Sequence, residues 1–240
     1  MKSVSIFSDP ESMAKKIANY WFKQATQAAK KQRIFTVVLS GGSTAKALYP
    51  ILANPHWKNS IPWKSVHIFF ADERCVPPNN EESNYKGALE NFINHVSIPE
   101  KNIHRIRGEE NPRRESLRYS EVIQKHFALK KKGMNYFDWV LLGLGSDGHT
   151  ASLFPGQKLI NSSRLCEVVQ HPKSGQERIT MTPMAINKSL RITFHVIGKG
   201  KSEIVAKLAS APLAKNIFPA LKIQGEWFLD KDASSKFDFT

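Results

Sequence analysis

The segment Phe137–Gly156, FDWVLLGLGSDGHTASLFPG, determines how the rest of the chain is interpreted. Its first half, Asp138–Leu144, is mostly apolar and too short for an independent helix, which predicts a buried strand. Three glycines then surround Ser146 and Asp147, and His149 follows them directly. Glycine permits tight turns and lets a ligand approach the backbone. Since ligands of open α/β sheets bind at the carboxyl edge of the strands, His149 is the candidate centre of the chemistry.

Two other interpretations of this turn were weighed. Gly143–Gly148 matches the G-x-G-x-x-G dinucleotide pattern, with Glu167 at a suitable distance for the ribose. Pro155 would end a following helix after about two turns, whereas that pattern needs a full helix beneath the pyrophosphate. The other interpretation makes His149 a polar turn residue that caps a short helix, because a single histidine is weak evidence of function. That second interpretation stays open.

The length and composition indicate a globular protein. A chain of 240 residues forms one large α/β domain or two small ones, and no linker or internal repeat is visible, so we expect a single domain over residues 1–240. No apolar run approaches the ~20 residues that span a bilayer. The start of the chain, MKSVSIFSDP, lacks the apolar core of a signal peptide, which predicts a cytoplasmic protein with reduced Cys75 and Cys166.

The net charge of +14 suggests an anionic partner, either a nucleic acid or a small anionic substrate. The lysines and arginines are scattered, however, and no recognisable nucleic-acid module accompanies them. Most of them are expected to form a solvated surface. The charge therefore does not decide the function.

A second glycine-rich turn follows the predicted strand Ile34–Leu39 and precedes a predicted helix over Ala45–Leu52. Ser40–Thr44 contains the pair Gly41 and Gly42 with three hydroxyl side chains. The glycines expose backbone N–H groups, and the helix dipole favours an anion. A capped strand-to-helix turn would need only one Ser or Thr. We therefore favour a phosphate site.

Two further junctions carry cations. The predicted strand Val66–Ala71 leads into an Asp-Glu-Arg cluster that ends in Arg74. This cluster is either a local ion-pair network or an anion site, and a guanidinium suits planar recognition of phosphate or carboxylate. Lys199 follows the predicted strand Arg191–Ile197 and is a second candidate for anion contact. The nearby Gly-Lys-Ser is not a P-loop, because His195 occupies the required upstream glycine position.

The remaining pattern completes an ordered set of strands and helices. Further strands are predicted at Val4–Phe7, Ile103–Ile106, Leu165–Val169, Arg178–Met181 and Gly225–Leu229. Further helices are predicted at Pro10–Lys31, at Asn84–Phe92, from Pro112 to about His126, and after Ser202 through Leu208.

Four segments together resemble the 6-phosphogluconolactonase family in sequence, order and spacing. They are VVLSGGST, HIFFADERCVPPNNEESNY, FDWVLLGLGSDGHTASLFPG and RITFHVIGKGKSEIV, and they span roughly Ile34–Val205. The resemblance implies an α/β, Rossmann-like three-layer α/β/α fold with a mostly parallel central sheet. It implies hydrolysis of 6-phospho-D-glucono-1,5-lactone to 6-phospho-D-gluconate in the oxidative pentose phosphate pathway. It also implies no metal, no cofactor, no nucleic acid, no membrane and no obligate protein partner.

The resemblance assigns roles to matching positions. His149 would be the general base that activates water, and Asp147 would orient it. Arg74 and Lys199 would supply positive charge to the phosphate or to the developing oxyanion, with the end that each faces left open. The residues expected near the phosphate are Gly41, Gly42, Ser43 and Thr44.

The residues agree with that chemistry. A δ-lactone needs water, a base that works near neutral pH and charge stabilisation, but no covalent nucleophile. The chain has no G-x-S-x-G elbow, no H-E-x-x-H motif and no clustered His/Cys/Asp ligand set in its sequence. The sequence therefore predicts metal-free hydrolysis.

Two rival functions were considered. Glucosamine-6-phosphate deaminases resemble the chain in the glycine-serine loop and the Asp-Gly-His turn, but they typically carry Ile-Ala-Phe-Asn-Glu after that turn and Asp-Glu-Tyr earlier. This chain has Thr-Ala-Ser-Leu-Phe-Pro and Asp-Glu-Arg at those places. The other rival is a non-catalytic basic module that binds nucleic acid or sugar phosphate, against which the presence of His149 and Asp147 argues.

Overall fold

A parallel seven-stranded sheet forms the centre of the molecule. The computed structural model describes residues 3–128, 136–157, 161–210 and 217–237. Every neighbouring pair in this sheet is parallel, in the order β1-β10-β9-β6-β2-β3-β5. The strands are β1 (Val4–Phe7), β2 (Phe35–Leu39), β3 (Val66–Phe70), β5 (Ile103–His104), β6 (Trp139–Leu142), β9 (Arg191–Val196) and β10 (Glu226–Asp230).

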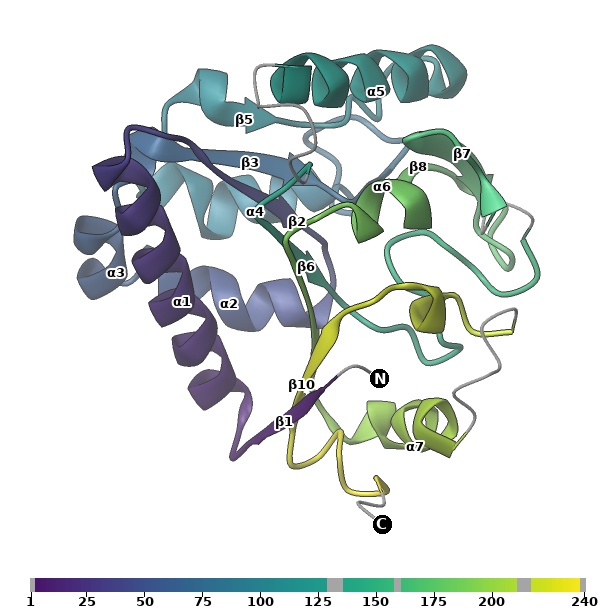
Figure 1. Cartoon of the computed structure of the whole chain (residues 1–240). Coiled ribbons are helices and arrows are strands. Elements are labelled where there is room, and N and C mark those ends of the chain that lie inside the picture. Colours follow the sequence, from purple (N-terminus) through teal and green to yellow (C-terminus); the bar gives the residue numbers. More distant parts are fainter. Residues whose placement is uncertain (1–2, 129–135, 158–160, 211–216, 238–240) are drawn as a thin grey trace.

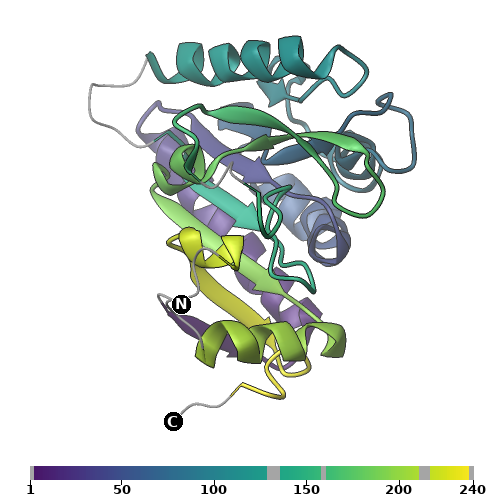
Figure 2. The same cartoon turned by 90° about the vertical axis from the view of Figure 1, so that its right-hand side faces the viewer.

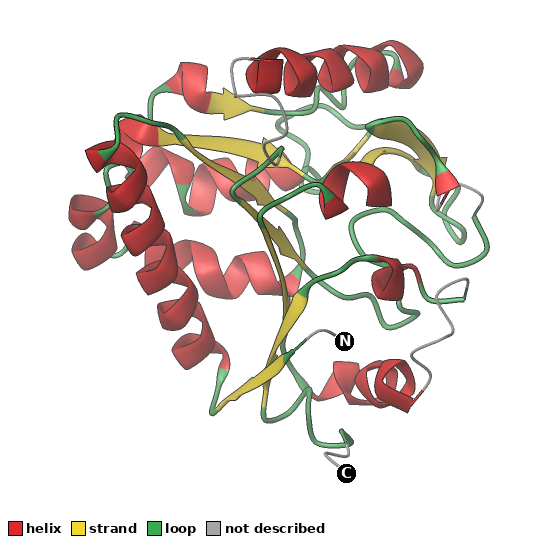
Figure 3. Cartoon of the chain, in the orientation of Figure 1, coloured by secondary structure: helices red, strands yellow, loops and turns green. Residues whose placement is uncertain are grey.

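Helices cover both faces of this sheet, so the molecule has three layers (Figures 1 and 3). One side carries α1 (Pro10–Lys30), α2 (Ser43–Ala53), α3 (Pro55–Ser60) and α4 (Asn84–Asn91), and the other carries α5 (Pro112–Ala128), α6 (Pro183–Asn187) and α7 (Ser202–Ser210). The expected α/β fold with a mostly parallel central sheet is confirmed. None of the helices in the described ranges is long and apolar enough to cross a membrane.

A small antiparallel sheet lies on the side of α5 and α6, facing the viewer in Figure 2. It consists of β4 (Asp72–Arg74), β8 (Glu177–Met181) and β7 (Cys166–Gln170), in that order. The strands predicted at Leu165–Val169 and Arg178–Met181 correspond to β7 and β8, which pair antiparallel. The Asp-Glu-Arg cluster does more than end β3, because it forms β4 and pairs with β8.

Local sequence explains the main elements. Asp9 caps α1 by accepting from the Ser12 amide, and Pro10 occupies the first helical position, where its missing N–H costs nothing. Strands β2 and β6 are entirely buried, as strands of a sheet covered on both faces must be. The core between α1 and the sheet is aromatic: Trp21 lies 6.0–6.3 Å, between ring centroids, from Phe35, Trp63, Phe92 and Trp139.

The strand order places the functional edge. Adjacent strands β2 and β6 continue in opposite directions across the sheet, β2 into β3 and β6 into β9. Their carboxyl-terminal loops therefore part, and a crevice opens between them, as at the switch points of other open α/β sheets. The loops at this crevice are Ser40–Gly42 and the glycine-rich turn that ends in His149.

Candidate active site

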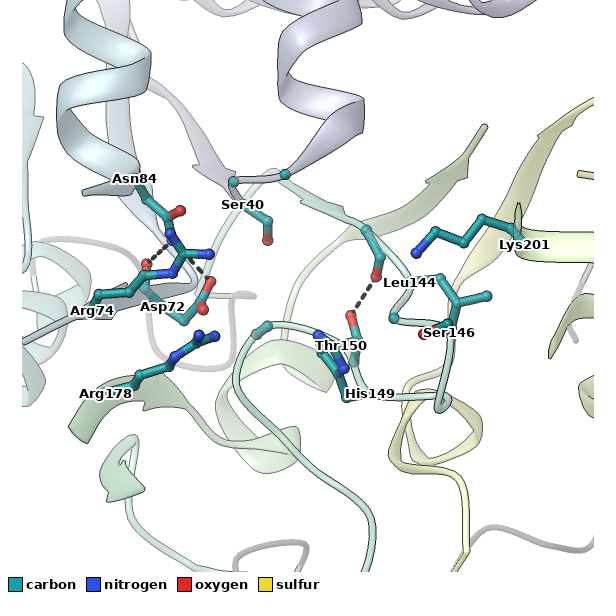
Figure 4. Close-up of a pocket in the computed structure, with 15 residues that line it drawn as sticks. Ser40, Asp72, Arg74, Asn84, Leu144, Ser146, His149, Thr150, Arg178 and Lys201 are labelled. Carbon is teal, nitrogen blue, oxygen red and sulfur yellow. Dashed lines mark hydrogen bonds between the residues drawn. The ribbon is translucent and has the colours of Figure 1, made fainter. Parts of the chain in front are cut away.

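A cavity of about 250 Å³ lies at this crevice and brings together residues from widely separated parts of the chain (Figure 4). The loops after β2, β6 and β9 line it, together with β4 and β8 of the small sheet and the start of α4. Its lining includes Ser40, Gly41, Gly42, Asp72, Arg74, Asn84, Gly145, Ser146, His149, Thr150, Arg178 and Lys201.

His149 forms a close pair with Asp147. The Nδ1 atom of His149 lies 2.6 Å from Oδ1 of Asp147, and the His149 backbone N–H donates to the same oxygen over 3.1 Å. The hydrogen bond from His149 lowers the pKa of Asp147 to about 2. Because an ionised carboxylate only accepts hydrogen bonds, Nδ1 carries the proton in a neutral ring, and Nε2 presents its lone pair.

The turn before His149 holds the pair in place. The Gly145 amide donates to the His149 carbonyl over 2.8 Å, and the Thr150 hydroxyl donates to the Gly143 carbonyl over 2.9 Å. A Cβ on Gly145 would lie 2.0 Å from Nδ1 of His149 and 2.6 Å from Oδ1 of Asp147. Only glycine fits at that position.

The two weaker interpretations of this turn fail in the structure. No helix begins in the described segment 149–157; Thr150 instead pairs with Leu153 in an isolated β-bridge. His149 therefore caps no helix, and the G-x-G-x-x-G match has no helix N-terminus on which to hold a pyrophosphate.

The glycine pair after β2 lies at the N-terminus of α2, as predicted, with Gly41 and Gly42 in the cavity wall. Gly42 is the N-cap of α2, and no side chain that the structure describes caps this helix. The hydroxyl of Ser40 is buried, lines the same cavity and has no hydrogen-bond partner among the described residues. The side chains of Ser43 and Thr44 lie outside the part of the chain that the structure describes. Free backbone amides and a buried hydroxyl suit an anion.

The residues of the Asp-Glu-Arg cluster do not share one role: part of the cluster supports the local structure and part of it lines the cavity. Glu73 is buried, and its carboxylate accepts from the Asn84 and Tyr85 amides at the start of α4, both over 2.8 Å. Burial raises the pKa of Glu73, which these hydrogen bonds oppose. Asp72 accepts from the Ser152 hydroxyl over 2.7 Å. Glu73 is therefore part of the local structure, whereas Asp72 and Arg74 both line the cavity.

Arg74 has an arginine partner that the sequence did not reveal. Arg178 on β8 stands directly opposite Arg74 in the antiparallel pairing, and both line the cavity (Figure 4). Burial and the Arg74 charge lower the pKa of Arg178. Like charges opposite one another destabilise a sheet unless an anion lies between them. The only sequence signal was a basic residue in a predicted strand, since the register between distant strands cannot be read from the sequence.

The lysine in the cavity is Lys201, two residues beyond the expected one. Lys199 is exposed and is not part of the cavity lining. A 3₁₀ turn, η5 (Lys199–Lys201), follows Gly198, and of its two lysines only Lys201 lines the cavity. Burial lowers the pKa of Lys201, and the charge of Asp147 opposes that shift. The sequence identified the correct junction, but not which lysine enters the site.

Comparison with known proteins agrees with this architecture. Residues 8–228 match the family model described as glucosamine-6-phosphate isomerases/6-phosphogluconolactonase. A 6-phosphogluconolactonase of Aggregatibacter actinomycetemcomitans is 41% identical over 203 residues, which cover 82% of this chain and 85% of that protein. A chloroplastic 6-phosphogluconolactonase of Arabidopsis thaliana is 37% identical over 248 residues, with coverage of 98% and 75%.

Solved structures show the same fold. The crystal structure of devB protein superposes with a TM-score of 0.91 at 39% identity and covers 99% of this chain and 100% of its own. A monomeric glucosamine-6-phosphate deaminase has a TM-score of 0.83 at 19% identity, with coverage of 98% and 99%, and shares the fold. The chain therefore belongs to the glucosamine-6-phosphate isomerase/6-phosphogluconolactonase family.

Proposed function

We propose that this protein hydrolyses 6-phospho-D-glucono-1,5-lactone to 6-phospho-D-gluconate, the lactone hydrolysis of the oxidative pentose phosphate pathway. The names of its closely similar relatives support this reaction. One observation in the structure carries the proposal: His149, which is paired with Asp147, lines the same cavity as three cations and the N-terminus of α2. That combination supplies a base for water and binding groups for an anionic substrate.

In this mechanism His149 is the general base. Its Nε2 accepts a proton from water as the water oxygen attacks the lactone carbonyl carbon. Asp147 accepts from Nδ1 and stabilises the imidazolium that forms. The tetrahedral intermediate then expels the ring oxygen, which takes the proton from Nε2. The ring C–O bond is broken, the base is regenerated, and the new carboxylic acid ionises.

The cations on either side of His149 in Figure 4 match the two anionic ends of the product. We assign the phosphate to the amides at the start of α2, the Ser40 hydroxyl and Lys201. We assign the carbonyl oxygen, and then the carboxylate, to Arg74 and Arg178, since guanidinium groups bind planar carboxylates in bidentate fashion. Charge stabilisation at the developing oxyanion acts only during the reaction, so it raises kcat.

A coupled assay on freshly generated 6-phosphogluconolactone tests the proposal, with spontaneous hydrolysis subtracted. We expect clear acceleration that survives treatment with a chelator. Glucosamine-6-phosphate serves as the comparison substrate, and no ammonia should be released from it. Ammonia release without lactone hydrolysis would assign the site to the deaminase reaction instead. Activity that disappears on chelation and returns with a divalent ion would refute the metal-free mechanism.

A further inference from the structure

Three histidines that the proposed mechanism does not use meet beneath α5. His67 is on β3, His104 is on the edge strand β5, and His126 is near the end of α5. Nδ1 of His67 lies 3.0 Å from Nε2 of His104, and each of the three rings offers a nitrogen within 4.8 Å of the others. The sequence predicts no clustered set of metal ligands, and this cluster shows that prediction to be wrong. None of the three lines the cavity around His149.

The fold brings these residues together from distant positions. His104 stands opposite Phe69 in the parallel pairing of β5 with β3, and His67 lies two residues earlier on the same face of β3. Tyr119 fixes α5 above them, because its hydroxyl bonds to the Phe70 backbone and to the His104 carbonyl. His126 is seven residues after Tyr119, so it returns to the same helix face. Figure 1 shows α5 beside β5 and β3 at one end of the sheet.

Burial disfavours the charged form of His67 and of His104, and the neutral imidazole is the form that binds metals. Phe69 stacks on His104 with ring centroids 4.3 Å apart, and Phe127 lies 5.4 Å from His126. Burial, with His67 nearby, lowers the pKa of His104 to about 4. Burial and the charge of Lys101 lower the pKa of His67.

We propose that His67, His104 and His126 bind one divalent late first-row transition-metal ion, with Zn²⁺ as the natural candidate. Imidazole nitrogen is a preferred ligand for Zn²⁺, and three histidines with an open fourth position form a known zinc arrangement. No carboxylate or thiol from the described ranges joins the cluster, which disfavours Mg²⁺ and Ca²⁺. The ion would replace the His67–His104 contact and link β3, the edge strand β5 and α5. This site is independent of the proposed lactonase reaction.

Titration of chelator-stripped protein with Zn²⁺ tests this site by calorimetry and by thermal unfolding. We expect one equivalent of Zn²⁺ to bind and to raise the unfolding temperature, because the ion favours the folded state. His67→Gln, His104→Gln and His126→Gln should each weaken binding by roughly tenfold or more. His56→Gln, on exposed α3, is the matched control and should bind as the unaltered protein does. Lactone hydrolysis should be the same with and without Zn²⁺.

Co²⁺ gives a second readout that does not depend on how the variants fold. Bound to the unaltered protein, it should show the intense visible absorption of a four-coordinate histidine site. Absence of saturable Zn²⁺ binding at micromolar concentrations would overturn the proposal. So would binding that persists in folded His104→Gln and His126→Gln proteins, or binding that is lost only in His149→Ala, which would move the metal to the cavity.

Discussion

At the scale of single residues, the proposed mechanism depends on His149. His149→Ala should lower kcat by roughly two to four orders of magnitude while the protein stays folded, because the base is removed and the binding groups remain. His56→Ala, outside the cavity, is the control and should leave kcat unchanged. Steady-state kinetics with circular dichroism measures both. Near-normal turnover by folded His149→Ala would mean that the imidazole is not the base.

The same pair predicts the dependence on pH. Activity should fall as acid protonates His149, because an imidazolium cannot accept a proton from water. Asp147 does not contribute to that decline, since its pKa of about 2 keeps it ionised. Its pKa is depressed from 3.8, so the pair stabilises the fold fully above pH 3.8 and loses this contribution as the pH falls towards 2. A kcat profile that is flat on the acid side, in protein that stays folded, would contradict the assignment of the base.

At the scale of elements, the turn between β9 and α7 separates two lysines in space. Lys201→Ala should lower kcat/KM for the phosphorylated lactone far more than for unphosphorylated gluconolactone, because remote binding energy holds the ring against His149. Lys199→Ala, its exposed neighbour on the same turn, should change little for either substrate. Both variants are assayed on both lactones. Equal losses for the two lactones in Lys201→Ala would place the phosphate elsewhere, with Arg74 the first alternative.

Arg178, which the pairing of β4 with β8 places opposite Arg74, is expected to affect both lactones alike, in contrast to Lys201. Arg178→Ala should lower kcat for both lactones by a similar factor, roughly 10- to 1000-fold, because the carbonyl oxygen is common to both substrates. Arg178→Lys keeps the charge but lacks the planar fork, so it should recover only part of the activity. A loss confined to the phosphorylated lactone would instead assign the arginine pair to the phosphate.

At the scale of the whole molecule, one cluster of buried apolar side chains joins both sheets. It extends from Met13 on α1 to Ala233 after β10 and includes Ile179 on β8. We therefore expect residues 1–240 to unfold as one domain, with far-ultraviolet circular dichroism, tryptophan fluorescence and lactonase activity lost in a single coincident transition in denaturant. A separate earlier transition that removes activity and spares the central sheet would show that the small sheet unfolds independently.

Local sequence pattern is enough to locate most of the strands and the turn that pairs His149 with Asp147. Buried parallel strands form apolar runs, and glycine turns follow them, so the strands, the turn at His149 and the loop after β2 could be located from local pattern. Asp147 and His149 are two residues apart, and their pairing needs only a tight turn.

Residues that lie far apart in the chain become neighbours only through the tertiary structure, and local pattern does not show which ones meet. Arg74 and Arg178 meet because β4 pairs with β8, and that register depends on packing between segments that the sequence does not connect. The choice of Lys201 over Lys199 depends on how one 3₁₀ turn leaves β9. His67, His104 and His126 have no recognisable spacing, because their proximity arises from sheet pairing and from the position of α5. Local pattern sets which elements form, whereas long-range packing sets which side chains meet.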